Sequence, residues 1–166
     1  MKFFMISPRR NSPIINIGHC IYNTFFRKND GIEILKQYFK KLFKMKYILL
    51  TSSGRNAMQK IIQSYNFELG SEIIFPVFTF YVLPQIVQQM GYAPVFVNCN
   101  SDLQIDVCEL EQKITLKTKV IVATHLFGNA CEIDKIIVIA RKFNIIVIED
   151  CAHTPKIAYK NKLLGM

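Results

Sequence analysis

An acidic pair directly follows an apolar run in the last quarter of the sequence. Ile145 to Ile148 are four consecutive β-branched residues, Glu149 and Asp150 come next, and His153 stands three residues further on. Such a run predicts a strand buried on both faces, as in a parallel sheet covered by helices. Ligands of these sheets bind beyond the carboxyl ends of the strands, where a carboxylate can hold a cationic ring nitrogen and an imidazole can hydrogen-bond a ring oxygen. The alternative is that Asp150 only caps the next helix or turn.

A second candidate group is a turn of small residues that opens a predicted helix. Ser52, Ser53 and Gly54 precede Arg55, and apolar residues then recur at helical spacing. The first N–H groups of a helix have no partner within the helix, and the helix dipole adds partial positive charge there, so this turn could cradle a phosphate. The Ser53 hydroxyl and the Arg55 cation could add contacts. The alternative is that Ser52 or Ser53 simply caps the helix.

Phe80 stands at the junction of a predicted strand and helix. An aromatic ring at such a junction can stack on a flat ligand. It can equally be a core side chain, and its position alone does not decide between the two roles.

The elements that must position these residues alternate along the chain. Apolar runs predict strands at 47–50, 72–75, 93–98, 119–124 and from 145 onward. Helical patterns lie between them, at 54 to about 70, 81–90, 106–114 and 133–143, and an amphipathic helix at 32–43 precedes the first strand. This order predicts an α/β fold with a largely parallel sheet.

The two ends of the chain differ from the middle. Residues 1–30 lack periodicity and contain Pro8, Pro13 and Gly18, which predicts an irregular N-terminal arm. Residues 31–166 then form one domain. After Asp150 the sequence shows no obvious helix or closing strand, so we expect this domain to be only part of a larger fold.

Composition narrows the class of protein. The chain has 166 residues, 51% of them hydrophobic, which predicts a globular protein with a real core. No apolar run approaches the roughly 18 residues that span a bilayer, and the N-terminus does not resemble a secretory signal, so we expect a cytoplasmic protein that binds no membrane. The net charge of +9 is densest at 36–46, where lysines occupy the polar side of the amphipathic helix. No nucleic-acid-binding motif accompanies them, and we expect no nucleic-acid partner.

The five cysteines show no C-x-x-C pair, which argues against a disulfide framework and a zinc site. Cys151 and His153 are two residues apart, but no third ligand or base stands near them in the sequence. We therefore expect no metal.

Taken together, these stretches resemble the DegT/DnrJ/StrS family of sugar-nucleotide aminotransferases, which are fold-type-I pyridoxal-phosphate enzymes. The resemblance covers residues 31 to 165 and rests on an ordered set of motifs: Ser52-Ser53-Gly54, Ile74-Phe75-Pro76 with Thr79-Phe80, Gly91 with Pro94-Val95-Phe96-Val97, Thr118-Lys119, His125-Leu126-Phe127-Gly128 and Glu149-Asp150-Cys151-Ala152-His153. It implies a three-layer α/β domain, with a mainly parallel sheet and helices on both faces, that corresponds to a truncated large domain.

The resemblance also implies pyridoxal 5′-phosphate as cofactor and assigns the site residues. Asp150 would pair with the pyridinium nitrogen, His153 would hydrogen-bond the ring's 3-oxygen, and Phe80 would stack on the ring. The phosphate contacts fall on three residues at the helix start: Ser53, Gly54 and Arg55. Family members typically move an amino group, commonly from glutamate, to a keto-sugar nucleotide, and they are typically homodimers.

One departure bears on activity. The family's Schiff-base lysine follows a Gly-Ser-Phe segment beyond the Glu-Asp motif, and Lys156, Lys160 and Lys162 do not match that position. We therefore expect this chain to be inactive in transamination by itself. Two further hypotheses stay open: a dehydratase branch of the family, in which histidine replaces the lysine, and a non-catalytic interaction module of the same fold.

Overall fold

The structure is a computed structural model that describes residues 3–5, 30–154 and 157–165. The chain divides into two compact units. The described residues of one unit are 3–5, 51–154 and 157–165, and those of the other are 30–50. Among the described residues, no helix is both long enough and apolar enough to cross a bilayer.

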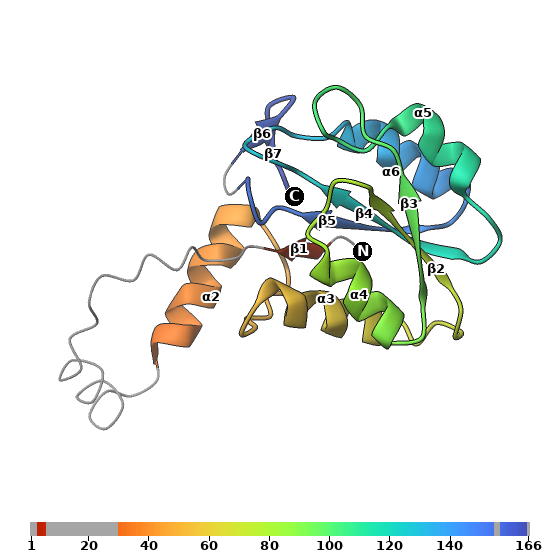
Figure 1. The fold of residues 1–166 in the computed structure, drawn as a ribbon. Helices are drawn as coiled ribbons and strands as arrows, with labels where there is room; N and C mark the ends of the chain where they lie inside the picture. The colour runs from red at the N-terminus through yellow and green to blue at the C-terminus, as the bar shows by residue number, and fades with distance from the viewer. Residues whose placement is uncertain (1–2, 6–29, 155–156, 166) are drawn as a thin grey trace. The chain divides into compact units, whose positions relative to one another are not determined.

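A five-stranded parallel sheet forms the centre of the larger unit (Figure 1). Its order is β1-β5-β4-β2-β3, and each neighbouring pair runs parallel. The strands are β1 (Phe3–Met5), β2 (Glu72–Pro76), β3 (Ala93–Val97), β4 (Thr118–Thr124) and β5 (Ile146–Asp150). Because all five strands run the same way, their carboxyl ends meet at one edge of the sheet.

Helices cover both faces of this sheet. On one face α3 (Gly54–Gln63) and α4 (Val82–Gln89) pack on a cluster that includes Met58, Ile73, Phe75, Val122 and Ile148. On the other face lie α5 (Val107–Leu110), the 3-10 helix η1 (Glu111–Lys113) and α6 (Ile133–Lys142).

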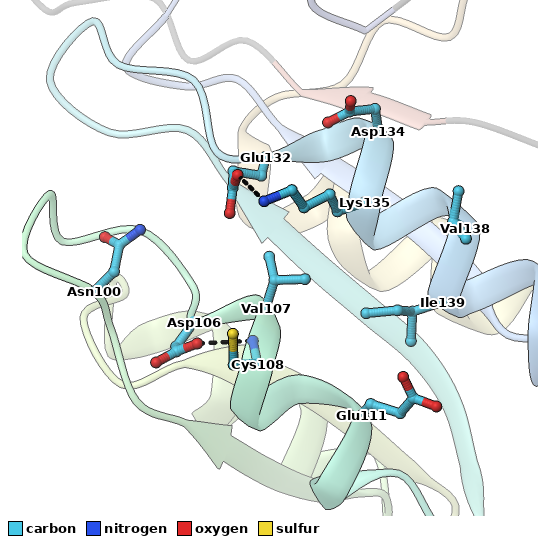
Figure 2. Close-up of a pocket in the computed structure, with 10 residues that line it drawn as sticks. All are labelled: Asn100, Asp106, Val107, Cys108, Glu111, Glu132, Asp134, Lys135, Val138 and Ile139. Carbon is cyan, nitrogen blue, oxygen red and sulfur yellow. Dashed lines mark hydrogen bonds and ion pairs between the residues drawn. The ribbon is translucent and has the colours of Figure 1, made fainter.

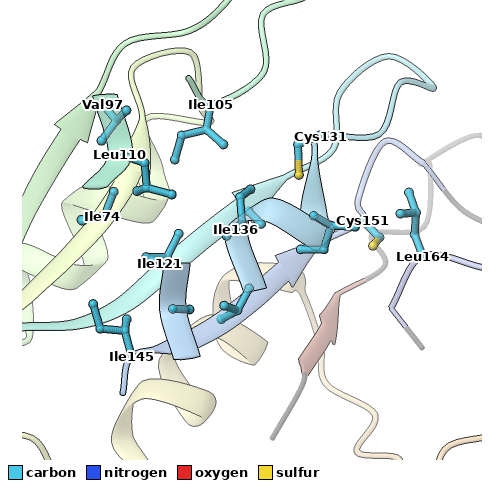
Figure 3. Close-up of a cluster of buried hydrophobic side chains, with 14 residues drawn as sticks. Ile74, Val97, Ile105, Leu110, Ile121, Cys131, Ile136, Ile145, Cys151 and Leu164 are labelled. Atoms are coloured by element: carbon cyan, nitrogen blue, oxygen red, sulfur yellow. The ribbon is translucent and has the colours of Figure 1, made fainter. Parts of the chain in front are cut away.

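The cluster on the α5 and α6 face is built mainly of branched aliphatic side chains (Figure 3). Ile74 and Ile121 come from adjacent strands, and Ile136 reaches them from α6. Neighbouring residues of each strand therefore point into different layers, and this double burial explains why the strands read as continuous apolar runs. The predicted three-layer α/β fold is confirmed.

Four local predictions were wrong. Residues 47–50 form no strand. Phe3–Met5, within the segment predicted to be irregular, form strand β1; the rest of that segment up to residue 29 lies outside the described residues. Pro76 belongs to β2 rather than ending the strand before it. Ala158–Tyr159 and Lys162–Leu163 form a hairpin, β6 and β7, whose two-residue turn places Lys160 and Asn161 at positive φ.

The smaller unit contains α2 (Asp30–Phe43). Glu33 accepts hydrogen bonds from Lys36 and Gln37 on its polar side. Phe43 is buried, whereas Leu35 and Tyr38, on the apolar side of the predicted amphipathic helix, are 42% and 51% exposed.

Candidate functional site

Asp150 is the last residue of β5 and is only 5% exposed. Side chains alternate along the strand, and Ile146 and Ile148 face α3 and α4, so Asp150 points to the same face. Its Oδ1 accepts a hydrogen bond from the Ala152 N–H at 3.1 Å. Burial raises the pKa of this carboxyl, while the Ala152 N–H and the nearby His153 and His125 imidazoles act in the opposite direction. A buried carboxylate of this kind gains from a cationic partner.

Thr124 lies beside Asp150 in the neighbouring strand, where the two residues are in register. It is also buried, and its Oγ1 has no hydrogen-bond partner among the described atoms. An unpartnered buried hydroxyl next to a buried carboxylate fits a polar ligand at this point of the sheet edge.

His153 follows β5 and is exposed. Its ring centroid lies 5.7 Å from that of Phe127, which in turn lies 6.1 Å from that of Phe78. These three rings, the aromatic row, join the chain segments that follow β5, β4 and β2. Phe78 and Phe127 were not predicted as site residues.

Phe127 is the more unusual member of the aromatic row. It is 65% exposed and has φ of 51°, followed by Gly128 with φ of 86°, in a tight turn closed by an Asn129 N–H bond to the Leu126 carbonyl. A bulky residue in the left-handed region is uncommon, and such backbone strain concentrates at functional sites. The sequence signal that could have found it is the aromatic residue immediately before Gly128.

The start of α3 has the geometry of an anion cradle. Ser53 caps the helix, with its Oγ accepting from the Asn56 N–H at 3.2 Å and its carbonyl accepting from the Ala57 N–H. Within the described part of the chain, the N–H groups of Gly54 and Arg55 have no backbone partner. Met58 and Ile62 pack on the sheet face shared with Asp150, and the short connection 64–71 leads to the start of β2. The helix therefore runs against the strands, and its N-terminus lies toward their carboxyl edge.

Phe80 follows β2 at the same edge and is 55% exposed. Its ring lies edge-on to Tyr81, with centroids 5.4 Å apart. The residues predicted for a cofactor site thus follow β2 and β5 or open α3. Their roles toward a ligand stay predictions.

A second group of ionisable residues lies behind Asp150. His125, Glu149 and Cys151 are buried, and one potential metal-ligand atom of each lies within 4.8 Å of the others. These donors are the described residues that could hold a metal ion. Glu149 points away from Asp150 because neighbouring residues of a strand face opposite ways.

The hollow drawn in Figure 2 lies between α5 and α6 and includes none of the predicted site residues. Its acidic side chains have partners: Asp106 caps α5, Glu132 pairs with Lys135, Asp134 with Lys160 and Glu111 with Lys142. Because these charges are satisfied locally, the hollow shows no group poised for chemistry.

Known proteins of similar sequence include GDP-perosamine synthases. The GDP-perosamine synthase of Escherichia coli O157:H7 is 30% identical over 151 residues, which is 90% of this chain and 42% of that protein. This chain therefore spans less than half the length of that relative.

Solved structures of similar fold include an aminotransferase and a sugar-nucleotide dehydratase. The aminotransferase from Psychrobacter cryohalolentis superimposes with a TM-score of 0.83 and 26% identity, over 97% of this chain and 42% of that one. GDP-4-keto-6-deoxymannose-3-dehydratase, solved with a trapped PLP-glutamate geminal diamine, superimposes with a TM-score of 0.78 and 28% identity, over 90% of this chain and 41% of that one.

The family expected from the ordered motifs is therefore confirmed, and so is pyridoxal phosphate as the cofactor of that family. Residues 14–166 match the sequence model of the family, and the chain belongs to the DegT/DnrJ/EryC1/StrS aminotransferase family.

Proposed function

We propose that this chain is the cofactor-binding part of a pyridoxal-phosphate-dependent aminotransferase that acts on keto-sugar nucleotides. The observation that carries the proposal is the buried Asp150 carboxylate at the carboxyl end of β5, on the sheet face covered by α3. Few structural roles require a carboxylate in such a place, since burial without a cationic partner is unfavourable. Pyridoxal phosphate, when bound, supplies an electron sink for amino-group transfer.

The residues of this chain have separable tasks in that proposal. The Asp150 carboxylate keeps a ring nitrogen protonated, and the His153 imidazole hydrogen-bonds the ring 3-oxygen. Phe80 covers one ring face and excludes water. The Gly54 and Arg55 N–H groups, with the Ser53 hydroxyl close by, hold the phosphate at the positive end of α3.

Proton transfer during transamination needs a lysine at the cofactor. Lys160 does not meet this need, because its Nζ pairs with Asp134 of α6 at 2.6 Å, on the sheet face opposite Asp150. Lys162 lies in the same hairpin. We therefore propose that the 166-residue chain binds the cofactor but does not transaminate by itself.

The proposal includes a homodimer and a cytoplasmic location, as is typical of the family. Val77, Tyr81 and Phe127, at the carboxyl edge, are more than half exposed, which is consistent with a second copy covering them. The dehydratase among the solved relatives supports a second candidate, a dehydratase branch acting on the same class of keto-sugar nucleotide.

The test is calorimetric titration with pyridoxine 5′-phosphate, which lacks the aldehyde and so forms no imines with surface lysines. Gly54→Pro removes one cradle N–H at the first helical position, where proline is tolerated, and should weaken binding about tenfold. Gly54→Ala is the matched control: no atom lies within 4 Å of the added Cβ, so affinity should stay the same.

The phosphate-free probe pyridoxine should bind both variants equally. Failure of the unaltered chain to bind pyridoxine 5′-phosphate would reject the proposed function and favour a non-catalytic module of the same fold.

A further inference from the structure

We propose that Glu149 and His125 are positioning residues for Asp150. With Cys131 and Gly165 they form a buried polar lock, defined by these four residues, that fixes the end of β5 from behind the cofactor face. The inference rests on the proposed function for its consequence in binding, but the lock itself can be tested without any ligand.

His125 defines the first half of the lock. The ring is 0% exposed, and its Nδ1 accepts the Cys131 N–H at 3.2 Å, with the Cys131 Sγ 3.4 Å away. A ring nitrogen that accepts a backbone N–H carries no proton, so in the neutral imidazole the proton is on Nε2. Nε2 faces the Glu149 Oε2 at 3.6 Å, an electrostatic contact just beyond hydrogen-bond length, and it has no hydrogen-bond partner among the described atoms. His125 therefore presents a donor to the carboxylate.

Glu149 defines the second half. Its side chain is 2% exposed, and the same Oε2 accepts the Gly165 N–H at 2.7 Å. This bond ties the second residue after the β6–β7 hairpin to β5. Leu164 packs in the cluster on the α6 face, which keeps water from this carboxylate (Figure 3).

The lock reaches Asp150 through the backbone. The His125 N–H donates to the Asp150 carbonyl at 3.0 Å, and Thr124 is in register with Asp150. This bond holds the last peptide of the strand, and the direction of the Asp150 Cα–Cβ bond depends on that peptide. Loss of the contact between the His125 ring and the Glu149 carboxylate would loosen two residues next to Asp150. These are Glu149, which precedes it in the chain, and His125, whose N–H bonds its carbonyl.

A metal ion is the competing occupant of this cluster, with Cys151 as the third donor. The geometry favours the lock, because the Glu149 Oε2 that faces His125 already accepts the Gly165 N–H. In addition, burial raises the pKa of the Cys151 thiol, which disfavours the thiolate that a metal needs.

The first experiment needs no cofactor. Hydrogen exchange is measured at the Gly165 and His125 amides in Glu149→Gln, with Glu132→Gln, at the half-exposed N-cap of α6, as the matched control. The lock predicts faster exchange at both amides in Glu149→Gln and at neither in the control. Faster exchange at Gly165 alone would show that the lock does not reach Asp150 and would overturn the proposal.

The second experiment measures affinity for pyridoxine 5′-phosphate in protein kept fully folded. Glu149→Gln and His125→Asn should weaken binding about tenfold, because a neutral amide oxygen accepts from Gly165 and faces His125 more weakly than the carboxylate does, and an asparagine is too short to reach Glu149. His125→Gln should restore part of the loss, because its amide can occupy the Nε2 position and donate to Glu149. A role confined to stability would leave the affinity of the folded variants unchanged, and that result would also overturn the proposal.

Metal analysis of the purified chain tests the alternative that a metal ion occupies this cluster. One equivalent of zinc that is lost in Cys151→Ser would assign His125 and Glu149 as ligands instead. If the unaltered chain binds no pyridoxine 5′-phosphate, the proposed function fails, and hydrogen exchange still decides whether the lock holds Asp150.

Discussion

Replacing Asp150 with asparagine should change folding stability and cofactor affinity in opposite directions. Burial raises the pKa of this carboxyl above its ordinary value of 3.8. The folded chain then binds more protons than the unfolded chain, so folding stability falls as pH rises from 3.8 through the folded-state pKa and stays reduced at neutral pH. An asparagine side chain at this position would carry no charge and would escape this penalty.

The size of the stability change follows from the contacts of Asp150. An asparagine Oδ1 can still accept the Ala152 N–H, although a neutral acceptor makes a weaker bond than a carboxylate. The weaker bond to Ala152 offsets part of what is gained when the charge is no longer buried. The net result is a gain of roughly 0.5–1 kcal/mol in the free energy of unfolding at pH 7. The gain should shrink toward pH 4, where the carboxyl of the unaltered chain becomes protonated.

The effect on binding is larger and opposite in sign. Asparagine cannot pair with a pyridinium nitrogen, and removing one partner of a largely buried ion pair costs about 2–3 kcal/mol where the other partner can lose its proton. The affinity for pyridoxine 5′-phosphate should therefore fall by roughly 30- to 150-fold.

Urea unfolding at pH 7 and pH 4 and calorimetric titration measure the two effects. Asp102→Asn, at an exposed loop position, is the matched control and should change neither. A variant Asp150→Asn that is less stable and binds the ligand as well as the unaltered chain would refute the reasoning. Asp150 would then be only a cap for the turn at Cys151–Thr154.

Three further changes test other parts of the fold. Phe127→Asn should raise the free energy of unfolding by about 0.5–1 kcal/mol in urea titrations, since asparagine tolerates positive φ; a loss would show that ring contacts outweigh the strain. Asp134 accepts hydrogen bonds from Lys160 and Tyr159, which lower the pKa of its carboxyl to about 2. Its contribution to folding stability is therefore present above pH 3.8 and is lost as pH falls toward 2. Asp134→Asn should speed tryptic cleavage in the β6–β7 hairpin at neutral pH, and unchanged cleavage would contradict this. Ile121→Ala should destabilise the fold by about 3–4 kcal/mol and Ile121→Val by about 1 kcal/mol, as read from urea midpoints, and equal effects would contradict the tight packing at this site.

The sheet and its helices could be predicted because double burial leaves a direct trace in the sequence. Val120–Ala123 and Ile145–Ile148 are apolar on both faces, and a parallel sheet covered by helices requires that pattern. The strands and helices of residues 51–150 accordingly lie within a few residues of their predicted bounds, apart from the longer predicted end of α3.

The wrong predictions have physical reasons. Strand β1 is three residues long and depends on pairing with a strand far along the chain, which no local pattern records. The β6–β7 turn uses Lys160 and Asn161 at positive φ without the glycine that usually marks such a turn. Residues 47–50 have the composition of a strand, but none of the described strands pairs with them.

For the candidate site, too, local features could be predicted from the sequence and contacts between strands could not. The positions of Asp150 at a strand end and of Ser53 at a helix start could be predicted, because each is visible in one stretch of sequence. The ring contacts of His153 with Phe127 and of Phe127 with Phe78, and the polar lock, could not be predicted, because these side chains meet only when adjacent strands align.

Strand β1 also constrains how the protein is made. Phe3 leaves the ribosome long before its partner Ile148. The sheet must therefore assemble from β2, β3, β4 and β5 before its outer edge can be completed, and a pairing between such distant residues forms slowly. Until then β5 presents an open edge to other nascent copies, which is a route to aggregation. Production should thus benefit from slow synthesis, since β1 has to reach the sheet edge last.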